Sequence, residues 1–168
     1  MKKRTARKKD FSILVVCSGN TCRSPMAEAI LRSELRRAGI AGVKVSSAGL
    51  DAEGTAQTAV HAVGALGMLG IRARPKKATP LGRETVDEAD LILAMTGDQK
   101  ERLAKMWPDS EGKTVVMSEF SGSSGGEIAD PIGGPLEAYI ECAARLLTEA
   151  NLVVPRVGTI LKQRRSAR

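Results

Sequence analysis

The segment from residue 11 to residue 25 constrains the fold of this chain more than any other. Residues 11–16 are apolar almost throughout, as expected for a strand buried on both faces of a parallel sheet. A loop follows, and Pro25 is typical of the first turn of a helix. The apolar positions of that helix repeat at helical spacing until Gly39, a typical helix stop. Strand, loop and helix in this order predict an α/β fold with a parallel sheet.

Strand-length apolar runs and helical patterns alternate along the rest of the chain. We predict further strands at 43–46, 90–95 and 113–118, and helices at 56–69, 97–106 and 135–150. Thr96 and Gln99 have the spacing of a capping box for the helix at 97–106. Residues 122–126 have a flexible Gly/Ser composition, and Pro155 is expected to break or kink the last helix.

The net charge of +7 lies mainly at the two ends of the chain. Residues 1–10 hold six Lys and Arg and one acidic residue, and residues 161–168 hold four and none. Residues 11–160 hold 16 basic and 18 acidic residues. We therefore predict a basic, disordered N-terminal extension (1–10), one domain (11–160) and a basic, disordered C-terminal tail (161–168). This distribution argues against nucleic acid as a partner, although either tail could bind RNA or an acidic protein.

The sequence favours a cytoplasmic protein without a membrane anchor. No apolar run approaches the ~18 residues of a membrane-spanning helix, and residues 11–16 are shorter than a signal-peptide core. The three cysteines, Cys17, Cys22 and Cys142, form no disulfide-framework pattern, which fits a reducing compartment. We expect a monomer.

The loop after the first strand has the composition of an anion-binding site. Gly19 and Asn20 tolerate backbone angles that most residues avoid, so the loop can curl with its N–H groups pointing inward. Ser24 is typical of an N-cap, and Pro25 of the first helical position. N–H donors at a helix N-terminus bind phosphate well.

Cys17 and Arg23 add chemistry to this loop. The guanidinium of Arg23 can hold two phosphate oxygens, and with the helix N-terminus it favours the thiolate form of Cys17. A thiolate beneath a bound phosphorus is placed for covalent phosphoryl transfer. A bare Cys-x5-Arg pattern is weak, but a buried strand before it and Ser-Pro after it make this one specific. The alternative is a buried structural Cys17 beside a surface arginine.

Four segments then resemble the low-molecular-weight protein tyrosine phosphatase family. Residues 16–28 are similar to its phosphate loop and first helix, 46–49 and 93–95 to its second and third conserved segments, and Asp130-Pro131 to its acid loop. The resemblance covers about residues 11–150. It implies a flavodoxin-like three-layer sandwich, in which helices cover both faces of a four-stranded parallel sheet, with a phosphate-binding loop after strand one. It also implies a cysteinyl-phosphate intermediate and neither metal nor other cofactor.

The same resemblance implies roles for individual residues. Cys17 is the nucleophile, Arg23 the transition-state clamp and Asp130 the general acid. Ser24 stabilises the thiolate, and Asn20 holds the loop's shape by hydrogen bonding, with Ser47 as a candidate partner. The phosphate would be bound by Ser18, Gly19, Asn20, Thr21, Cys22, Arg23 and Ser24. The family further implies a reversible Cys17–Cys22 disulfide that protects the nucleophile, whereas the alternative is a Cys22 thiol that only packs.

Two features bear on the substrate. Family members that act on phosphotyrosine usually have a bulky aliphatic residue at the position of Thr21 and aromatic residues after the Asp-Pro. This chain has Thr21 and, after Pro131, Ile132-Gly133-Gly134. It is similar instead to the bacterial protein arginine phosphatases, from which Ile132 departs by not being aromatic. Hydrogen-bond acceptors at Thr21 and Asp130 suit a guanidinium, so we predict hydrolysis of phosphoarginine in proteins.

Other functions stay open. The first alternative is a phosphotyrosine phosphatase with the same chemistry, followed by an arsenate reductase and a non-catalytic redox or phosphate sensor. Cys142, on the core face of the last helix, is expected to be inert and a poor disulfide relay. His61, the only histidine, is expected to be structural, and Pro75-Lys76-Lys77 stand where many family members have a histidine.

Overall fold

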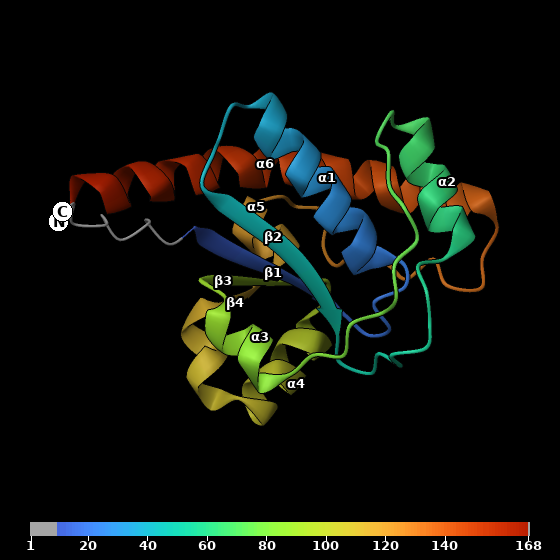
Figure 1. The fold of residues 1–168 in the computed structure, drawn as a ribbon, viewed down its shortest axis with the longest axis horizontal. Helices are drawn as coiled ribbons and strands as arrows, with labels where there is room; N and C mark the ends of the chain where they lie inside the picture. Colours follow the sequence, from blue (N-terminus) through green and yellow to red (C-terminus); the bar gives the residue numbers. More distant parts are fainter. Residues whose placement is uncertain (1–9, 168) are drawn as a thin grey trace, which may run out of the picture.

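A parallel sheet with the strand order β2-β1-β3-β4 lies at the centre of the computed structural model, which describes residues 10–167 (Figure 1). Its strands are β1 (Phe11–Cys17), β2 (Val43–Gly49), β3 (Leu91–Ala94) and β4 (Thr114–Val116). The helices are α1 (Arg23–Arg37), α2 (Val60–Met68), α3 (Arg83–Glu88), α4 (Gly97–Met106), the 3-10 helix η1 (Pro108–Lys113), α5 (Met117–Ser121) and α6 (Leu136–Ser166). The predicted fold class is confirmed.

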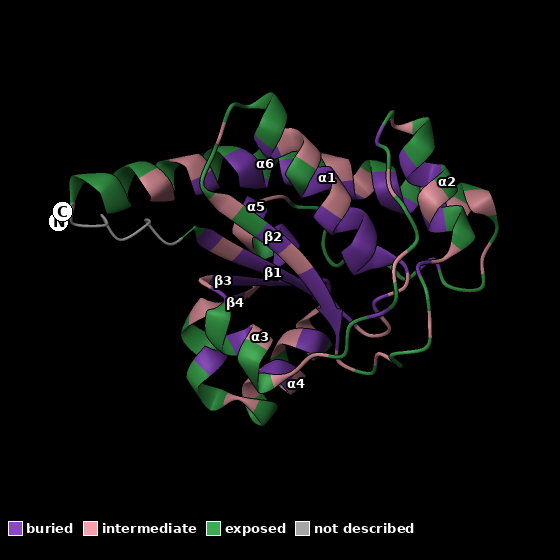
Figure 2. Ribbon diagram, viewed as in Figure 1, coloured by how far each residue is buried: buried purple, intermediate pink, exposed green. Residues whose placement is uncertain are grey.

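Strand β1 separates two apolar cores because its side chains alternate between the faces of the sheet. Ile13 and Val15 belong to the larger core, which includes residues of α1, α2 and α6. Leu14 and Val16 belong to a smaller core with residues of α3 and α4. Figure 2 shows the buried central strands between these helical layers. The expectation of a first strand buried on both faces is therefore confirmed.

The strand order places the carboxyl end of β1 at a topological switch point. The chain moves from β1 to β2 on one side and later returns to β3 on the other. Connections that diverge in this way leave a crevice at the carboxyl ends of the strands, where α/β proteins bind ligands. Cys17 is the last residue of β1 and pairs in register with Gly49 of β2.

One helix start and one helix cap differ from the predictions. Helix α1 begins at Arg23, and its N-cap is Cys22 without a side-chain hydrogen bond, so Ser24 is not the cap. Helix α4 begins as predicted, with the Thr96 hydroxyl accepting from the Gln99 amide at 3.3 Å. The Gln99 side chain accepts from the Met95 amide at 3.0 Å instead of the Thr96 amide, so the capping box is only half formed.

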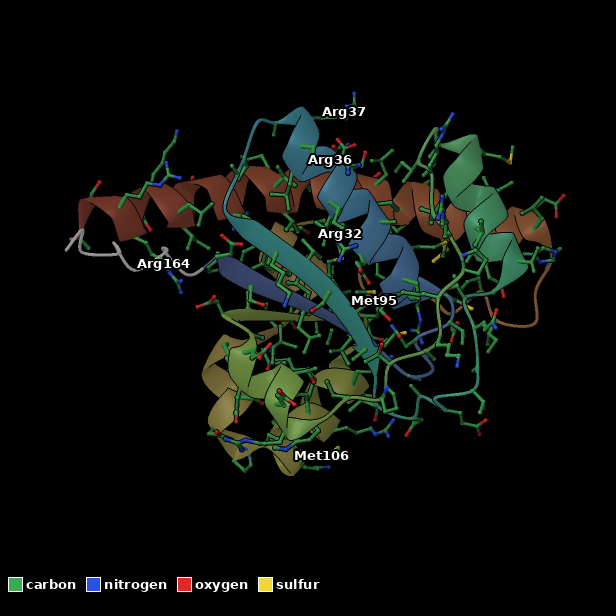
Figure 3. All side chains as sticks on the ribbon, in the orientation of Figure 1. Arg32, Arg36, Arg37, Met95, Met106 and Arg164 are labelled. Atoms are coloured by element: carbon green, nitrogen blue, oxygen red, sulfur yellow. The ribbon has the colours of Figure 1, made fainter. Side chains whose placement is uncertain are left out.

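The last helix is longer than predicted. Helix α6 continues past residue 150 and through Pro155 to Ser166, so the expected break is wrong. Pro155 is exposed, and the carbonyl that its ring leaves without a helical partner can therefore bond water. Arg164 near the end of α6 (Figure 3) lies 4.6 Å from the centre of the Phe11 ring and pairs with Asp90 at 3.1 Å.

The structure tests the prediction for the C-terminal segment but not the one for the N-terminal segment. Residues 161–166 are helical, so the prediction of a disordered C-terminal tail is wrong for them. Residues 1–9 of the predicted N-terminal extension lie outside the described residues. The domain limits at 11 and 160 stay a prediction. None of the helices within residues 10–167 is long and apolar enough to cross a lipid bilayer.

Candidate active site

The loop after β1 curls around a single left-handed residue. Asn20 has φ 54° and is the only non-glycine residue with positive φ within residues 10–167. Its buried side chain stabilises this turn by accepting a hydrogen bond from the Thr79 amide at 2.8 Å. The prediction of an unusual backbone angle is confirmed for Asn20 but is wrong for Gly19, whose φ is not positive.

The carbonyl groups of the loop face its protein neighbours, whereas its amides do not. Carbonyl oxygens at positions 17, 18 and 21 accept hydrogen bonds of 2.9–3.0 Å from the amides of Leu50, Asp51 and Ala59. The amides of residues 18–22 donate to no other group of the described chain. A run of N–H donors without internal acceptors, at the start of a helix, is a cradle for an anion.

A glycine in β2 permits this curled loop. A Cβ atom on Gly49 would lie 2.5 Å from the Ser18 carbonyl oxygen and 2.8 Å from the Asn20 amide nitrogen. Both atoms belong to the backbone of the loop, which therefore could not move aside cheaply. The physical reason for glycine at the end of segment 46–49 is this close approach of two backbones.

A hydrogen-bonded chain supports the thiol of Cys17. The Ser24 hydroxyl lies 2.9 Å from the Cys17 sulfur, and Asn20 Nδ2 donates to Ser24 Oγ at 2.8 Å and to Ser47 Oγ at 2.9 Å. Because Asn20 already donates to the Ser24 oxygen, the hydroxyl hydrogen of Ser24 is free to point at the sulfur. The structure thus brings Cys17, Asn20, Ser24 and Ser47 together, as the sequence analysis expected.

The chain continues to two residues that sequence reasoning missed. The Ser47 hydroxyl donates to Glu28 Oε2 at 2.6 Å, and the Lys76 ammonium donates to Ser47 Oγ at 3.0 Å. Lys76 also pairs with the buried carboxylate of Glu28, as does Arg32 at 2.8 Å. The sequence signal for Lys76 is its place in the Pro75-Lys76-Lys77 segment, which departs from the resemblance to the family. In the structure Lys76 reaches Glu28 and Ser47 from this segment.

Arg23 and Asp130 meet at the mouth of the loop. Arg23 is buried, and its Nη1 donates to the Ile128 carbonyl at 3.1 Å while Nη2 donates to Asp130 Oδ2 at 2.8 Å. Its Nε is buried without a hydrogen-bond partner in the described chain. The Asp130 side chain is 36 % exposed. The guanidinium thus retains one unused donor beside the amide cradle, which suits an anion.

Cys22 and its neighbours line the other side of the loop. The Cys22 sulfur lies 3.5 Å from the Thr21 hydroxyl and donates to Tyr139 Oη at 3.5 Å. Burial, together with the Cys22 contact, raises the pKa of Tyr139 to about 12, so this phenol stays protonated. His61 is exposed and stacks edge-on against Tyr139 at 5.3 Å, which fits the expected structural role.

The three cysteines are unpaired within the described chain. Cys17, Cys22 and Cys142 are all free thiols. Burial raises the pKa of Cys142 to about 12, so its thiol is protonated and unreactive, as expected. Within residues 10–167, no three His, Cys, Asp or Glu side chains come together as a metal site.

The loop before Asp130 is fixed by a buried carboxylate on α6. Glu149 accepts hydrogen bonds from the hydroxyls of Ser121 and Ser123 and pairs with Arg145. Arg145 also donates to the carbonyl groups at positions 125 and 126, at 2.6 and 3.0 Å. The Gly/Ser segment that the composition marked as flexible is therefore held to the helix on both sides of its turn.

The family model of low molecular weight phosphotyrosine protein phosphatases matches residues 12–164. The chain belongs to this family. It is 40% identical over 149 residues to a protein-arginine-phosphatase of Geobacillus stearothermophilus, covering 89% of this chain and 97% of that protein. It is 36% identical over 125 residues to the low molecular weight protein-tyrosine-phosphatase Ptp of Acinetobacter johnsonii, covering 71% and 79%.

A solved structure of a phosphatase from this family has the same fold. The structure is a cysteine-to-serine variant of the arginine phosphatase YwlE with a phosphorylated active-site serine. It matches with a TM-score of 0.83 and 34% identity, covering 88% of this chain and 96% of that chain. The predicted family and the resemblance to its arginine phosphatases are confirmed.

Proposed function

We propose that this phosphatase-family protein hydrolyses phosphoarginine in proteins through a cysteinyl-phosphate intermediate on Cys17. The observation that carries the proposal is a loop whose amides, at residues 18–22, donate to no group of the described chain. The loop surrounds a thiol that has a hydroxyl partner 2.9 Å away. Arg23 and Asp130 stand at the mouth of the same loop. This arrangement supplies the anion site, the nucleophile and the acid that phosphoryl transfer needs.

The first step forms the bond between Cys17 Sγ and phosphorus. The phosphoryl oxygens are held by the loop amides and by Arg23, which offset the charge of the transition state. The bond between phosphorus and the guanidine nitrogen of the substrate breaks, and Asp130 gives its proton to that nitrogen. Ser24 acts on the sulfur: its hydroxyl stabilises the thiolate before attack.

The second step releases phosphate. Asp130, now ionised, takes a proton from water, and the water oxygen attacks phosphorus as the bond to Cys17 Sγ breaks. The leaving thiolate again receives the Ser24 hydrogen bond. In the structure Arg23 Nη2 contacts Asp130 Oδ2 at 2.8 Å, which holds the carboxyl group at the mouth of the loop. A bound phosphoryl group competes for the Arg23 guanidinium and so frees Asp130 to face the leaving group.

The choice of phosphoarginine rests on the mouth of the site and on the arginine phosphatase relatives. Thr21 is half-buried, with its hydroxyl at the loop, and Asp130 is the nearby acceptor for a guanidinium. Ile132, at a position where phosphotyrosine phosphatases usually have an aromatic residue, is aliphatic and 65% exposed, so it provides no ring for stacking against a phenyl group.

Phosphotyrosine is the second candidate substrate, and one observation favours it. Val60 is 82% exposed and follows Ala59, whose amide is bonded to the Thr21 carbonyl. Val60 and Ile132 therefore offer apolar surface to a phenyl ring at the mouth. Hydrolysis of phosphoarginine and phosphotyrosine on one peptide scaffold separates the candidates. A higher kcat/KM for phosphotyrosine would overturn the arginine assignment, and no hydrolysis of either would overturn the phosphatase function.

The proposal includes redox protection of Cys17 by Cys22 in a reducing, cytoplasmic setting. Both thiols are buried and belong to one loop, so a sulfenic acid on Cys17 can be trapped as a disulfide before further oxidation. Peroxide should inactivate the wild type, and a thiol reductant should restore it. In Cys22→Ser the loss should be largely irreversible, whereas Cys142→Ser serves as the matched control. Equal recovery of Cys22→Ser and wild type would exclude the protective disulfide.

A further inference from the structure

A second basic site lies in a pocket between α1 and the segment 71–76. The pocket has a volume of ≈ 320 Å³. Helix α1 contributes Arg32 and Arg36, which are one turn apart, and the extended segment contributes Arg72 and Arg74, which are two residues apart. Figure 3 labels the two helical arginines on the α1 ribbon, and Figure 1 shows the segment after α2 passing beside α1. Two elements thus present arginine pairs to one hollow.

Both oxygens of the carboxylate in the pocket already have partners. Among the described residues, Glu28 is the only acidic one that lines the pocket. Its two oxygens pair with Arg32 at 2.8 Å and with Lys76, and Oε2 also accepts from Ser47 at 2.6 Å. Glu28 and Lys76 also end the hydrogen-bonded chain that begins at Cys17. The pocket therefore lies next to the residues that hold the catalytic loop in place.

The other three guanidinium groups of the pocket have no side-chain partners within the part of the chain that the structure describes. Arg36, Arg72 and Arg74 make no side-chain ion pair or hydrogen bond within residues 10–167. Four arginines and one lysine against one carboxylate leave the lining with a net charge of four positive. Buried Leu66 and Ile71 also line the pocket, and low-polarity surface strengthens electrostatic interactions. Such a lining favours a multiply charged anion.

We propose that this pocket binds a small polyphosphate anion with at least two linked phosphate groups. Each guanidinium can hold two phosphate oxygens, so separate arginines can grip separate groups. A phosphate group carries about 1.5 to 2 negative charges near neutral pH. A single phosphate therefore does not neutralise the four positive charges of the lining, whereas two or three linked phosphates do. Inorganic triphosphate and a nucleoside triphosphate share this chemistry.

Calorimetric titration of inorganic triphosphate into the full-length protein tests the site. Orthovanadate, a phosphate analogue, is present at a concentration that just saturates the catalytic loop. We expect one equivalent of triphosphate to bind the wild type and its affinity to fall at least about tenfold in Arg72→Gln/Arg74→Gln, since two charge-assisted contacts are lost. Arg37→Gln is the control. Arg37 lies on α1 next to Arg36, but it pairs with Glu34 and does not line the pocket.

Comparing the affinities of ATP, triphosphate and orthophosphate identifies the class of ligand. Retained phosphatase activity shows that each variant is folded. Tighter binding of ATP than of triphosphate would assign a nucleotide, and equal binding would assign the phosphate chain alone. Absence of binding in the presence of vanadate, or an unchanged affinity in the double variant, would overturn the site. Orthophosphate binding as tightly as triphosphate would overturn the requirement for linked phosphate groups.

Discussion

The Ser24 hydroxyl lies 2.9 Å from the Cys17 sulfur and receives a hydrogen bond from Asn20 Nδ2 at 2.8 Å. The second contact fixes the first, because it occupies the serine oxygen as an acceptor and leaves the hydrogen for the sulfur. Ser24 follows the first residue of α1, so the helix sets its position. The hydroxyl therefore serves the nucleophile instead of capping the helix.

Replacing Ser24 by Ala should reduce kcat about 10- to 150-fold, because a hydrogen bond to a charged group contributes about 1.5–3 kcal/mol. Steady-state kinetics on a phosphorylated peptide would measure the loss. Ser33→Ala, a half-buried serine of the same helix, is the control and should keep the wild-type kcat. An unchanged kcat in Ser24→Ala would show that the hydroxyl does not assist the sulfur.

Removing the carboxylate of Asp130 should reduce turnover by roughly 10²–10⁴-fold, the range for a general acid–base. The reduction should be smallest for aryl phosphates with acidic phenols, which leave without protonation. Asp130→Asn tests this on a series of such substrates, and it keeps a side chain that can contact Arg23. A loss that is the same for every leaving group would show that Asp130 acts only by holding Arg23.

Lys76→Met should destabilise the support beneath the catalytic loop. The variant leaves Glu28 buried with one cationic partner fewer and removes a donor from Ser47. We expect the free energy of unfolding to fall by about 1–3 kcal/mol, with a lower kcat. Lys77→Met is the matched control, because Lys77 is exposed and makes no side-chain bond in the described chain. Denaturant unfolding of both variants is the measurement, and equal stabilities would refute the role of Lys76.

The carboxylate of Glu149 should make stability depend on pH. Burial alone would raise the pKa of Glu149, but hydrogen bonds from Ser121, Ser123 and Arg145 outweigh burial and hold it below the ordinary value of 4.5. A lowered folded-state pKa adds stability that is complete above the ordinary value and is lost as the pH falls through the lowered one. Glu149→Gln should therefore cost about 1–3 kcal/mol at pH 7 and progressively less below pH 4.5.

Urea denaturation of wild type and Glu149→Gln at pH 7 and pH 3 measures that difference. Glu141→Gln, on an exposed position of the same helix, should show no such trend. A difference in stability that stays constant with pH would mean that the hydrogen bonds of Glu149 do not depend on its charge.

The contacts of Glu149 could not be predicted from the sequence. The loop and strand of residues 11–25 were predictable because each residue type there has a local backbone preference. Glu149 and Arg145 act through contacts with a segment about twenty or more residues away, and no local pattern reveals such contacts. The Gly/Ser composition of residues 122–126 indicated flexibility. Composition alone gives no information about a distant residue that holds the segment in place.

The helix errors have a related cause. Pro155 was expected to break α6 because proline removes a helical hydrogen bond, yet the packing of Val153, Val154 and Val157 in the core holds the helix together. The short helices α3 and α5 have too few turns for a periodic apolar pattern, so they were not predicted. The residues of the candidate site were easier to predict than the ends of the surrounding helices. Glu28 and Lys76 are the site residues that the sequence pattern did not reveal.

Thr21 should decide the substrate. Its hydroxyl lies at the loop, 3.5 Å from the Cys22 sulfur, and the exposed Val60 directly follows Ala59, whose amide donates to the Thr21 carbonyl. Thr21→Ile would remove the polar contact and extend the apolar surface that Val60 begins, which suits a phenyl ring. Loss of a polar contact in a desolvated site costs about 1–3 kcal/mol, or roughly 5- to 150-fold.

We therefore expect wild type to prefer phosphoarginine, and Thr21→Ile to shift the ratio of kcat/KM values toward phosphotyrosine by at least about tenfold. Both substrates should be placed on one peptide scaffold at a fixed, neutral pH, because phosphoarginine is acid-labile. Thr21→Ser, which keeps the hydroxyl, should retain the wild-type preference. An unchanged ratio in Thr21→Ile would place the selectivity elsewhere, and Asp130 beside Arg23 and the exposed Ile132 would be the next residues to test.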